Sequence, residues 1–124
     1  MTAATSRPRS STETMTTPLP TLWLFLAAGP AANGAAAVLA EAHEAAAGGR
    51  RVRAILSGAG LEWTREDALA AFARLESSDV CLCSQSARRG GWAPEALPPW
   101  IRWSSVAAWL GGRADSEEIW GVFP

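Results

Sequence analysis

The chain is organised around the stretch Val80–Trp92, with the sequence VCLCSQSARRGGW, which contains both cysteines. Its first four residues are apolar and predict a short buried strand. The small polar residues that follow Cys83 are typical of a loop or a helix cap. Arg88 and Arg89 come next, and cationic side chains or a helix start near a thiol lower its pKa. We therefore predict that Cys83 is a reactive thiolate at a strand end, stabilised by Arg88 and Arg89.

The second cysteine, Cys81, lies two residues before Cys83. On a strand this spacing places both side chains on the same face, where a disulfide between them would be strained. We therefore expect two free thiols and a cytoplasmic location. Cys81 is expected in the core, although it remains a second candidate for the catalytic role. Two cysteines and one histidine fall short of the four ligands of a structural zinc site, so no metal or cofactor is expected.

The composition limits the domain organisation and the function. A chain of 124 residues with a net charge of −1 indicates one domain and gives no electrostatic argument for nucleic acid or a membrane surface. All its cations besides the histidine are arginines, so lysine chemistry such as Schiff-base formation is excluded. Residues 1–20 are rich in Thr, Ser and Pro and predict a disordered tail before a single α/β domain at 21–124. The apolar run that begins at Leu22 is too short for a membrane span, and a signal peptide is not expected.

Strand and helix patterns alternate along residues 21–124. The predicted strands are 21–28, 51–56, 80–83, 100–103 and 119–123, and the main predicted helices are 31–48, 64–76 and 106–110. Asn33 is a candidate cap for the first helix, and Thr64 with Asp67 resembles a capping box for the second. Alternation of this kind requires crossover connections, which predict a parallel five-stranded sheet with helices on both faces, a three-layer α/β/α fold.

In such sheets the working site lies at the carboxyl ends of the strands. Cys83 is expected at this edge, together with Gly29-Pro30 and the loop Ser57–Gly60. The tryptophans crowd the last third of the chain, and we expect Trp92, Trp100 and Trp109 to be candidates for a subunit interface.

The spacing Cys83-x5-Arg89 suggests an alternative function. A Cys-x5-Arg loop between a strand and a helix is the phosphate cradle of protein tyrosine phosphatases, and rhodaneses use a similar loop. Here the residues between Cys83 and Arg88 include no glycine that would let the backbone wrap an anion. A further alternative is a non-catalytic oligomer subunit whose cysteines are structural.

The chain resembles the DsrE/DsrF/TusD family of sulfur-relay proteins. Three elements carry the resemblance: the first strand followed by Gly29-Pro30-Ala31, the second strand followed by Ser57–Leu61, and Cys83-Ser-Gln-Ser-Ala-Arg88-Arg89-Gly90. The resemblance covers residues 22–123, and the cysteine–arginine element is its specific part. Counted back from the arginines, the family cysteine falls at Leu82, so the register leaves both Cys81 and Cys83 open.

The resemblance implies a DsrE-like three-layer fold and assembly into homo- or hetero-trimers or hexamers. It implies a sulfurtransferase role in which a cysteine accepts sulfane sulfur as a persulfide from a donor protein and passes it to an acceptor protein. In the family this relay serves tRNA thiolation or sulfur oxidation.

Overall fold

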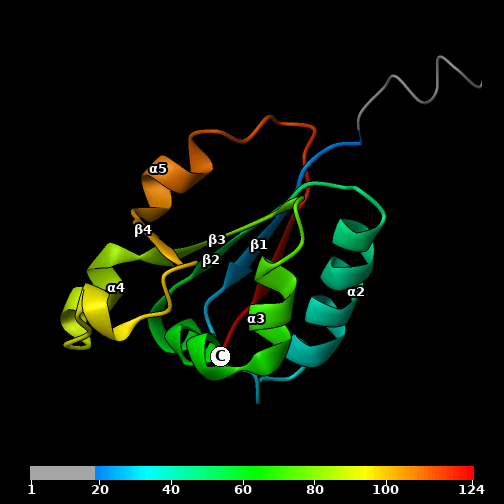
Figure 1. Ribbon diagram of the computed structural model, residues 1–124. Coiled ribbons are helices and arrows are strands. Elements are labelled where there is room, and N and C mark those ends of the chain that lie inside the picture. The colour runs from blue at the N-terminus through cyan, green and yellow to red at the C-terminus, as the bar shows by residue number, and fades with distance from the viewer. Residues whose placement is uncertain (1–18) are drawn as a thin grey trace, which may run out of the picture.

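The computed structural model describes residues 19–124. The tail that we expect to be disordered lies, except for its last two residues, outside the described part of the chain. In Figure 1 the strands form a twisted central sheet, with α2 and α3 packed along one side and α5 lying apart from them.

Strands and helices alternate in the predicted order. The described elements are β1 (Leu22–Leu26), α2 (Ala35–Ala47), β2 (Val52–Leu56), the 3-10 helix η1 (Gly58–Arg65), α3 (Asp67–Ala73), β3 (Ser78–Cys83), α4 (Ser84–Arg89), the 3-10 helix η2 (Pro94–Ala96), β4 (Arg102–Ser104), α5 (Val106–Leu110) and β5 (Ile119–Val122).

The strands form one five-stranded sheet in the order β4-β3-β2-β1-β5. Every pairing is parallel, which confirms the predicted α/β fold with a parallel sheet. Leu26 pairs with Leu56, and Leu56 pairs with Leu82. The carboxyl ends of β1, β2 and β3 are therefore level with one another.

The two faces of the sheet bury different side chains. Leu24 and Leu82 point to a face on which they form one cluster with Leu39 of α2 and Phe72 of α3. Burying a large apolar side chain stabilises the fold by about 1.5–3 kcal/mol, so this face supplies most of the core energy. Among the described helices, α4 also joins this cluster, through Ala87.

The opposite face is covered by a single short helix in the described part of the chain. A second cluster forms there with Trp109 of α5, and its other buried members are Trp23, Ile55, Cys81 and Cys83. The Trp109 ring stands edge-on to Trp23 at 4.9 Å between ring centres. Among the described helices, only the five-residue α5 therefore contributes a buried side chain to the second cluster.

Two predicted helix caps are wrong. The first helix begins after Gly34, whose φ of 81° forms the cap without any side-chain hydrogen bond, so Asn33 does not cap it. The predicted capping box at Thr64 is absent because η1 continues through Arg65, and α3 starts only after Glu66. The Trp63 indole N–H donates to Ala28 O at 2.8 Å, which fixes η1 against the chain that follows β1.

Gly60 allows this close approach. A Cβ atom at Gly60 would lie 1.8 Å from Leu26 O, which is far inside van der Waals contact. Only glycine fits where η1 passes the end of β1. The small residues of the predicted loop Ser57–Gly60 therefore form the start of a tight 3-10 helix.

The other element boundaries differ little from prediction. The predicted fourth strand begins at Trp100, but β4 begins at Arg102 because Ile101 N closes a turn onto Pro98 O at 3.1 Å. The predicted helix Val106–Leu110 is confirmed, and Ser105 Oγ caps it by accepting from Ala108 N at 3.0 Å.

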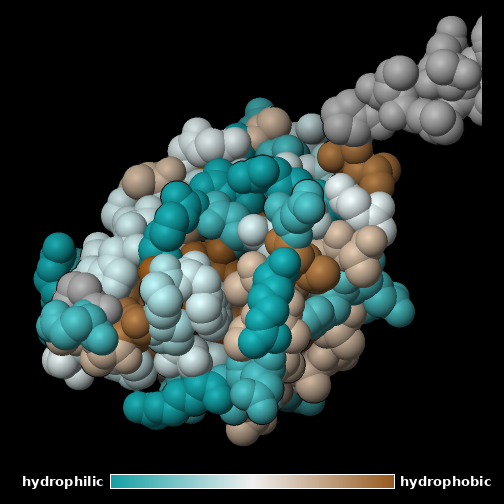
Figure 2. Space-filling view, viewed as in Figure 1, coloured by the Kyte–Doolittle hydropathy of each residue, from teal (hydrophilic) through white to brown (hydrophobic). Residues whose placement is uncertain are grey.

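The surface in Figure 2 is mixed, with hydrophobic atoms in small areas between polar side chains on the face that is shown. Within residues 19–124, no helix has the length and apolar character needed to cross a bilayer.

Candidate functional site

Cys83 occupies the junction between β3 and α4. It is the last residue of β3 and the residue that precedes the first turn of α4, with φ −65° and ψ 114°. Its neighbour at the carboxyl edge is Ser57, which follows the last residue of β2. The predicted strand-end position of Cys83 is therefore confirmed.

Hydrogen-bond donors surround the sulfur of Cys83. Burial, which leaves 5% of the residue exposed, would by itself raise the pKa of the thiol. Hydrogen bonds from the Ser86 hydroxyl group, from the backbone N–H groups of Ser86 and Gln85, and from the Ser57 hydroxyl group outweigh this effect. The pKa of Cys83 is therefore below its ordinary value, which favours the nucleophilic thiolate.

Ser86 connects the thiol to the neighbouring loop. Its Oγ atom accepts a hydrogen bond from Gly58 N at 3.0 Å and lies 3.3 Å from Ser57 Oγ. The start of η1 and the first turn of α4 are thus tied together beside Cys83. Sequence reasoning missed Ser57 as a partner of the thiol, although its position after the adjacent strand β2 could have identified it.

Arg88 and Arg89 lie in the last turn of α4. Both are exposed in the last turn of the helix, and the groups that shift the pKa of Cys83 are serine and backbone donors. Stabilisation of the thiolate by these arginines therefore stays a prediction. The chain between Cys83 and Arg89 is helical, whereas a Cys-x5-Arg phosphate cradle needs a loop that wraps the anion.

Cys81 has the opposite electrostatic environment. Burial raises the pKa of its thiol, and the Asp79 carboxylate raises it further, while Arg102 and Arg53 lower it. Its only close polar side chain in the described hydrogen bonds is Arg102, with Nη2 at 3.8 Å from Sγ. The net increase in pKa keeps this thiol protonated and favours Cys83 as the reactive cysteine.

Asp79 holds two arginines on the same face as Cys81. Its Oδ2 atom is hydrogen-bonded to Arg102 of β4 and lies 3.4 Å from Arg53 Nε of β2. The Arg53 guanidinium also lies 4.8 Å from the centre of the Trp23 ring, a cation–π contact. These contacts link side chains of four adjacent strands, β1 to β4. Cys81 therefore lies beside groups that stabilise the sheet.

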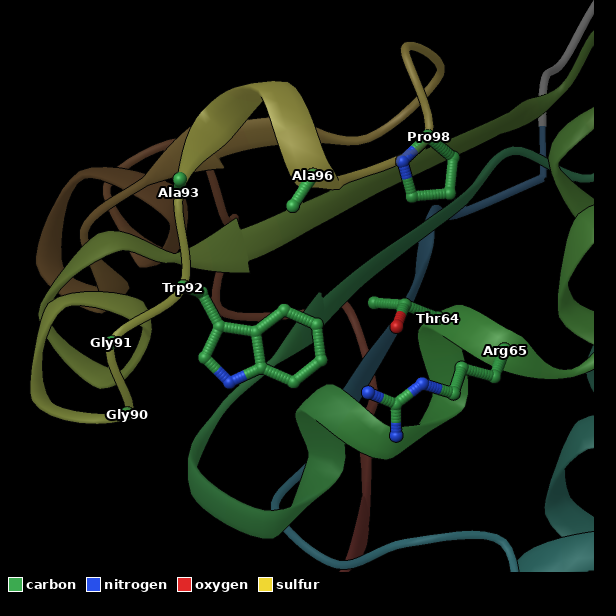
Figure 3. A pocket seen from close by; sticks show the side chains of 8 residues that line it. All are labelled: Thr64, Arg65, Gly90, Gly91, Trp92, Ala93, Ala96 and Pro98. Atoms are coloured by element: carbon green, nitrogen blue, oxygen red, sulfur yellow. The ribbon is translucent and has the colours of Figure 1, made fainter.

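Two hollows flank the segment that follows α4. The smaller, of about 290 Å³, is lined by Ser86 and Arg89 among other residues. The larger, of about 550 Å³, is lined by Thr64 and Arg65 of η1. Figure 3 shows that Trp92 projects into the larger hollow toward Arg65. Arg65 was not predicted from the sequence to lie in this region.

The predicted interface tryptophans differ in their surroundings. Trp109 is only 1% exposed, packed in the second cluster, so it is a core residue of the single chain. Trp92 and Trp100 are partly buried against the main core.

Metal-binding clusters of three or more His, Cys, Asp or Glu are absent from the part of the chain that the structure describes. Both cysteines are free thiols. The one histidine, His43, joins α2 to α3, because its Nε2–H donates to Ala68 O at 2.8 Å.

No protein-family model and no curated protein matches this chain.

Proposed function

We propose that this protein is a sulfur-transfer protein that carries a persulfide on Cys83 and passes it to a partner protein in the cytoplasm. The observation that carries the proposal is the set of hydroxyl and backbone donors from Ser57, Gln85 and Ser86 around the Cys83 sulfur. These donors favour a thiolate, and a thiolate is the form that attacks sulfane sulfur. The resemblance of the cysteine–arginine element to sulfur-relay proteins supports the same function.

The proposed cycle needs no external oxidant or reductant. The Cys83 thiolate attacks the outer sulfur of a donor persulfide, a new S–S bond forms, and the donor thiolate leaves with the electron pair of the broken S–S bond. An acceptor thiolate then attacks the outer sulfur on Cys83 and releases the Cys83 thiolate. Because an S–S bond is about 2.05 Å long, the transferred sulfur lies about that far beyond the buried Sγ atom.

Loading and release of sulfane sulfur test this function. After incubation with inorganic polysulfide and removal of the excess, cyanolysis should release sulfane sulfur from the wild type and from Cys81→Ser, and none from Cys83→Ser. Repeated turnover of thiosulfate with cyanide, or of an aryl phosphate, would instead favour the rhodanese-like or phosphatase alternative. Absence of sulfane sulfur on the wild type would contradict the proposal.

We also propose that the protein assembles into a trimer or hexamer, as the resemblance implies. Three exposed apolar side chains support this: Leu110, Ile119 and Phe123, at 37%, 39% and 61% exposure. Ile119 pairs with Trp23 in the sheet, and Phe123 stacks on Phe25 with 5.9 Å between ring centres, so both lie on the thinly covered face. Analytical ultracentrifugation tests the assembly, and a monomer at micromolar concentration would contradict it.

A further inference from the structure

The two hollows beside α4 are adjacent and together form a candidate binding region. They share Gly90 and Trp92 in their linings, so Trp92 lies where they meet. Together their volumes fall within the range of about 300–1,000 Å³ that is typical of small-molecule sites. An extended small molecule could therefore occupy both hollows and lie across Trp92.

Each hollow has one arginine in its lining. Arg89 lines the smaller hollow, and Arg65 lines the larger one with its guanidinium 5.4 Å from the centre of the Trp92 ring (Figure 3). Within residues 19–124, the ion pairs involve Arg50, Arg53 and Arg102, so neither of these two arginines has an acidic partner there. Arginine is suited to bind carboxylates through paired N–H donors. The region therefore fits a molecule with two anionic groups separated by a middle part that rests on the indole.

The smaller hollow lies beside the first turn of α4, which directly follows Cys83. Ser86 lines this hollow, and the Ser86 hydroxyl group also lowers the pKa of Cys83 by hydrogen bonding. Cys83 itself lines neither hollow and is only 5% exposed, so its unloaded thiol is reached more readily by a small donor than by the cysteine of a folded protein. Loading adds an outer sulfur about 2 Å beyond Sγ, and this sulfur is the atom that the acceptor protein attacks. A small donor can enter a hollow that the surface of a folded protein cannot.

We propose that the sulfur donor is a low-molecular-weight persulfide with two carboxylates, of about tripeptide size, bound by Arg65 and Arg89 across Trp92. This inference rests on the proposed function of Cys83, and it specifies the class of donor. In the loading step the Cys83 thiolate attacks the outer sulfur of R–S–SH. The S–S bond of the donor breaks, Cys83–S–SH forms, and R–S⁻ leaves with the electron pair.

Binding is tested first with a probe that cannot transfer sulfur. S-methylglutathione has the size and the two carboxylates of the proposed class, and calorimetry measures its Kd directly. Arg65→Gln and Arg89→Gln should each weaken binding about tenfold, because each removes a charge-assisted contact. Arg74→Gln is the matched control, because Arg74 is an exposed arginine that lines neither hollow, and it should change Kd less than twofold. No binding to the wild type, or equal weakening by all three variants, would overturn the inference.

Loading is then compared between two donors. With glutathione persulfide, Arg65→Gln should load Cys83 about tenfold more slowly than the wild type, whereas with inorganic polysulfide the two proteins should load at similar rates. An equal loss with both donors would show that Arg65 does not act by binding the donor, and would overturn the inference while the proposed function stands. If neither donor loads the wild type, the proposed function fails, and the calorimetric result still decides whether the hollows bind the dicarboxylate.

Discussion

Cys81 and Cys83 lie two residues apart on one face of β3, yet the pKa of Cys81 is raised and that of Cys83 is lowered. The difference arises from their partners. Cys83 is at the strand end, where hydroxyl and N–H donors are available, whereas Cys81 is buried inside the sheet beside the Asp79 carboxylate. A single pleat of the strand thus separates a thiol whose pKa is lowered from one whose pKa is raised.

The first prediction concerns the pH dependence of alkylation. The thiolate is the reactive form, so the rate with iodoacetamide rises as the pH passes the pKa of the thiol. In Cys81→Ser, the midpoint for Cys83 should lie below that of an unstructured cysteine peptide, and in Cys83→Ser the midpoint for Cys81 should lie above it. Coincident midpoints in the two variants would contradict the assigned environments.

The second prediction concerns Ser86. Ser86→Ala removes the hydroxyl donor from the Cys83 sulfur and should raise the pKa of Cys83. Because a hydrogen bond to a charged group contributes about 1.5 kcal/mol or more, alkylation of Cys83 near pH 7 should become about tenfold slower. Ser84→Ala is the control, since the Ser84 hydroxyl is not among the described donors to Cys83, and its alkylation rate should match that of the wild type. Equal rates for Ser86→Ala and the wild type would show that the hydroxyl does not stabilise the thiolate.

The third prediction concerns Asp79. Asp79→Asn removes the charge that Arg53 and Arg102 share, and Arg53 Nε is already buried without a hydrogen-bond partner in the described part of the chain. The free energy of unfolding in urea should fall by about 1–3 kcal/mol. The pKa of Cys81 should fall as well, because Asp79 raises it.

A surface pair provides the control for Asp79. Glu118→Gln breaks the Arg50–Glu118 ion pair, whose Glu118 side chain is 58% exposed, and should change stability by less than about 1 kcal/mol. Equal losses from Asp79→Asn and Glu118→Gln would mean that the inner pair adds nothing specific to the sheet.

The fourth prediction concerns the approach of η1 to β1. Gly60→Ala places a methyl group 1.8 Å from Leu26 O, which must displace backbone, and should destabilise the fold by about 2 kcal/mol or more. Gly48→Ala is the matched control, because its φ is −81° and the nearest atom to the new Cβ is 3.5 Å away. That change should be neutral or slightly stabilising, by up to about 1 kcal/mol. Urea unfolding measures the stability of both variants. If Gly60→Ala had the same free energy of unfolding as the wild type, the close approach of η1 to β1 would be contradicted.

The sequence was sufficient to predict the sheet, because its evidence is local. The apolar run at Leu22–Leu26 and the alternation of strand and helix patterns depend only on neighbouring residues. The position of Cys83 followed from the apolar residues before it and the polar residues after it. The helix starts were predicted less well, because they depend on contacts between residues that are distant in sequence. The Trp63 indole donates to Ala28 O, and this contact favours η1 over the predicted cap at Thr64.

The composition of the candidate site was harder to predict. Ser57 and Ser86 are 29 residues apart in sequence and meet only because β2 and β3 are adjacent and end level. The contact between Arg65 and Trp92 likewise depends on how η1 packs beside the segment after α4. Arg88 and Arg89 are close to Cys83 in sequence, but α4 exposes them in its last turn, and the groups that lower the pKa of Cys83 are serine and backbone donors.

Intact-mass spectrometry after exposure to polysulfide tests the central claim most directly, on the wild type, Cys81→Ser and Cys83→Ser. The proposal predicts one added sulfur atom on the wild type and on Cys81→Ser, removed by a reducing agent, and no addition on Cys83→Ser. If the added sulfur were absent from Cys81→Ser and present on Cys83→Ser, the assignment of the persulfide to Cys83 would be contradicted. If none of the three proteins gained sulfur, sulfur transfer by this chain would be contradicted.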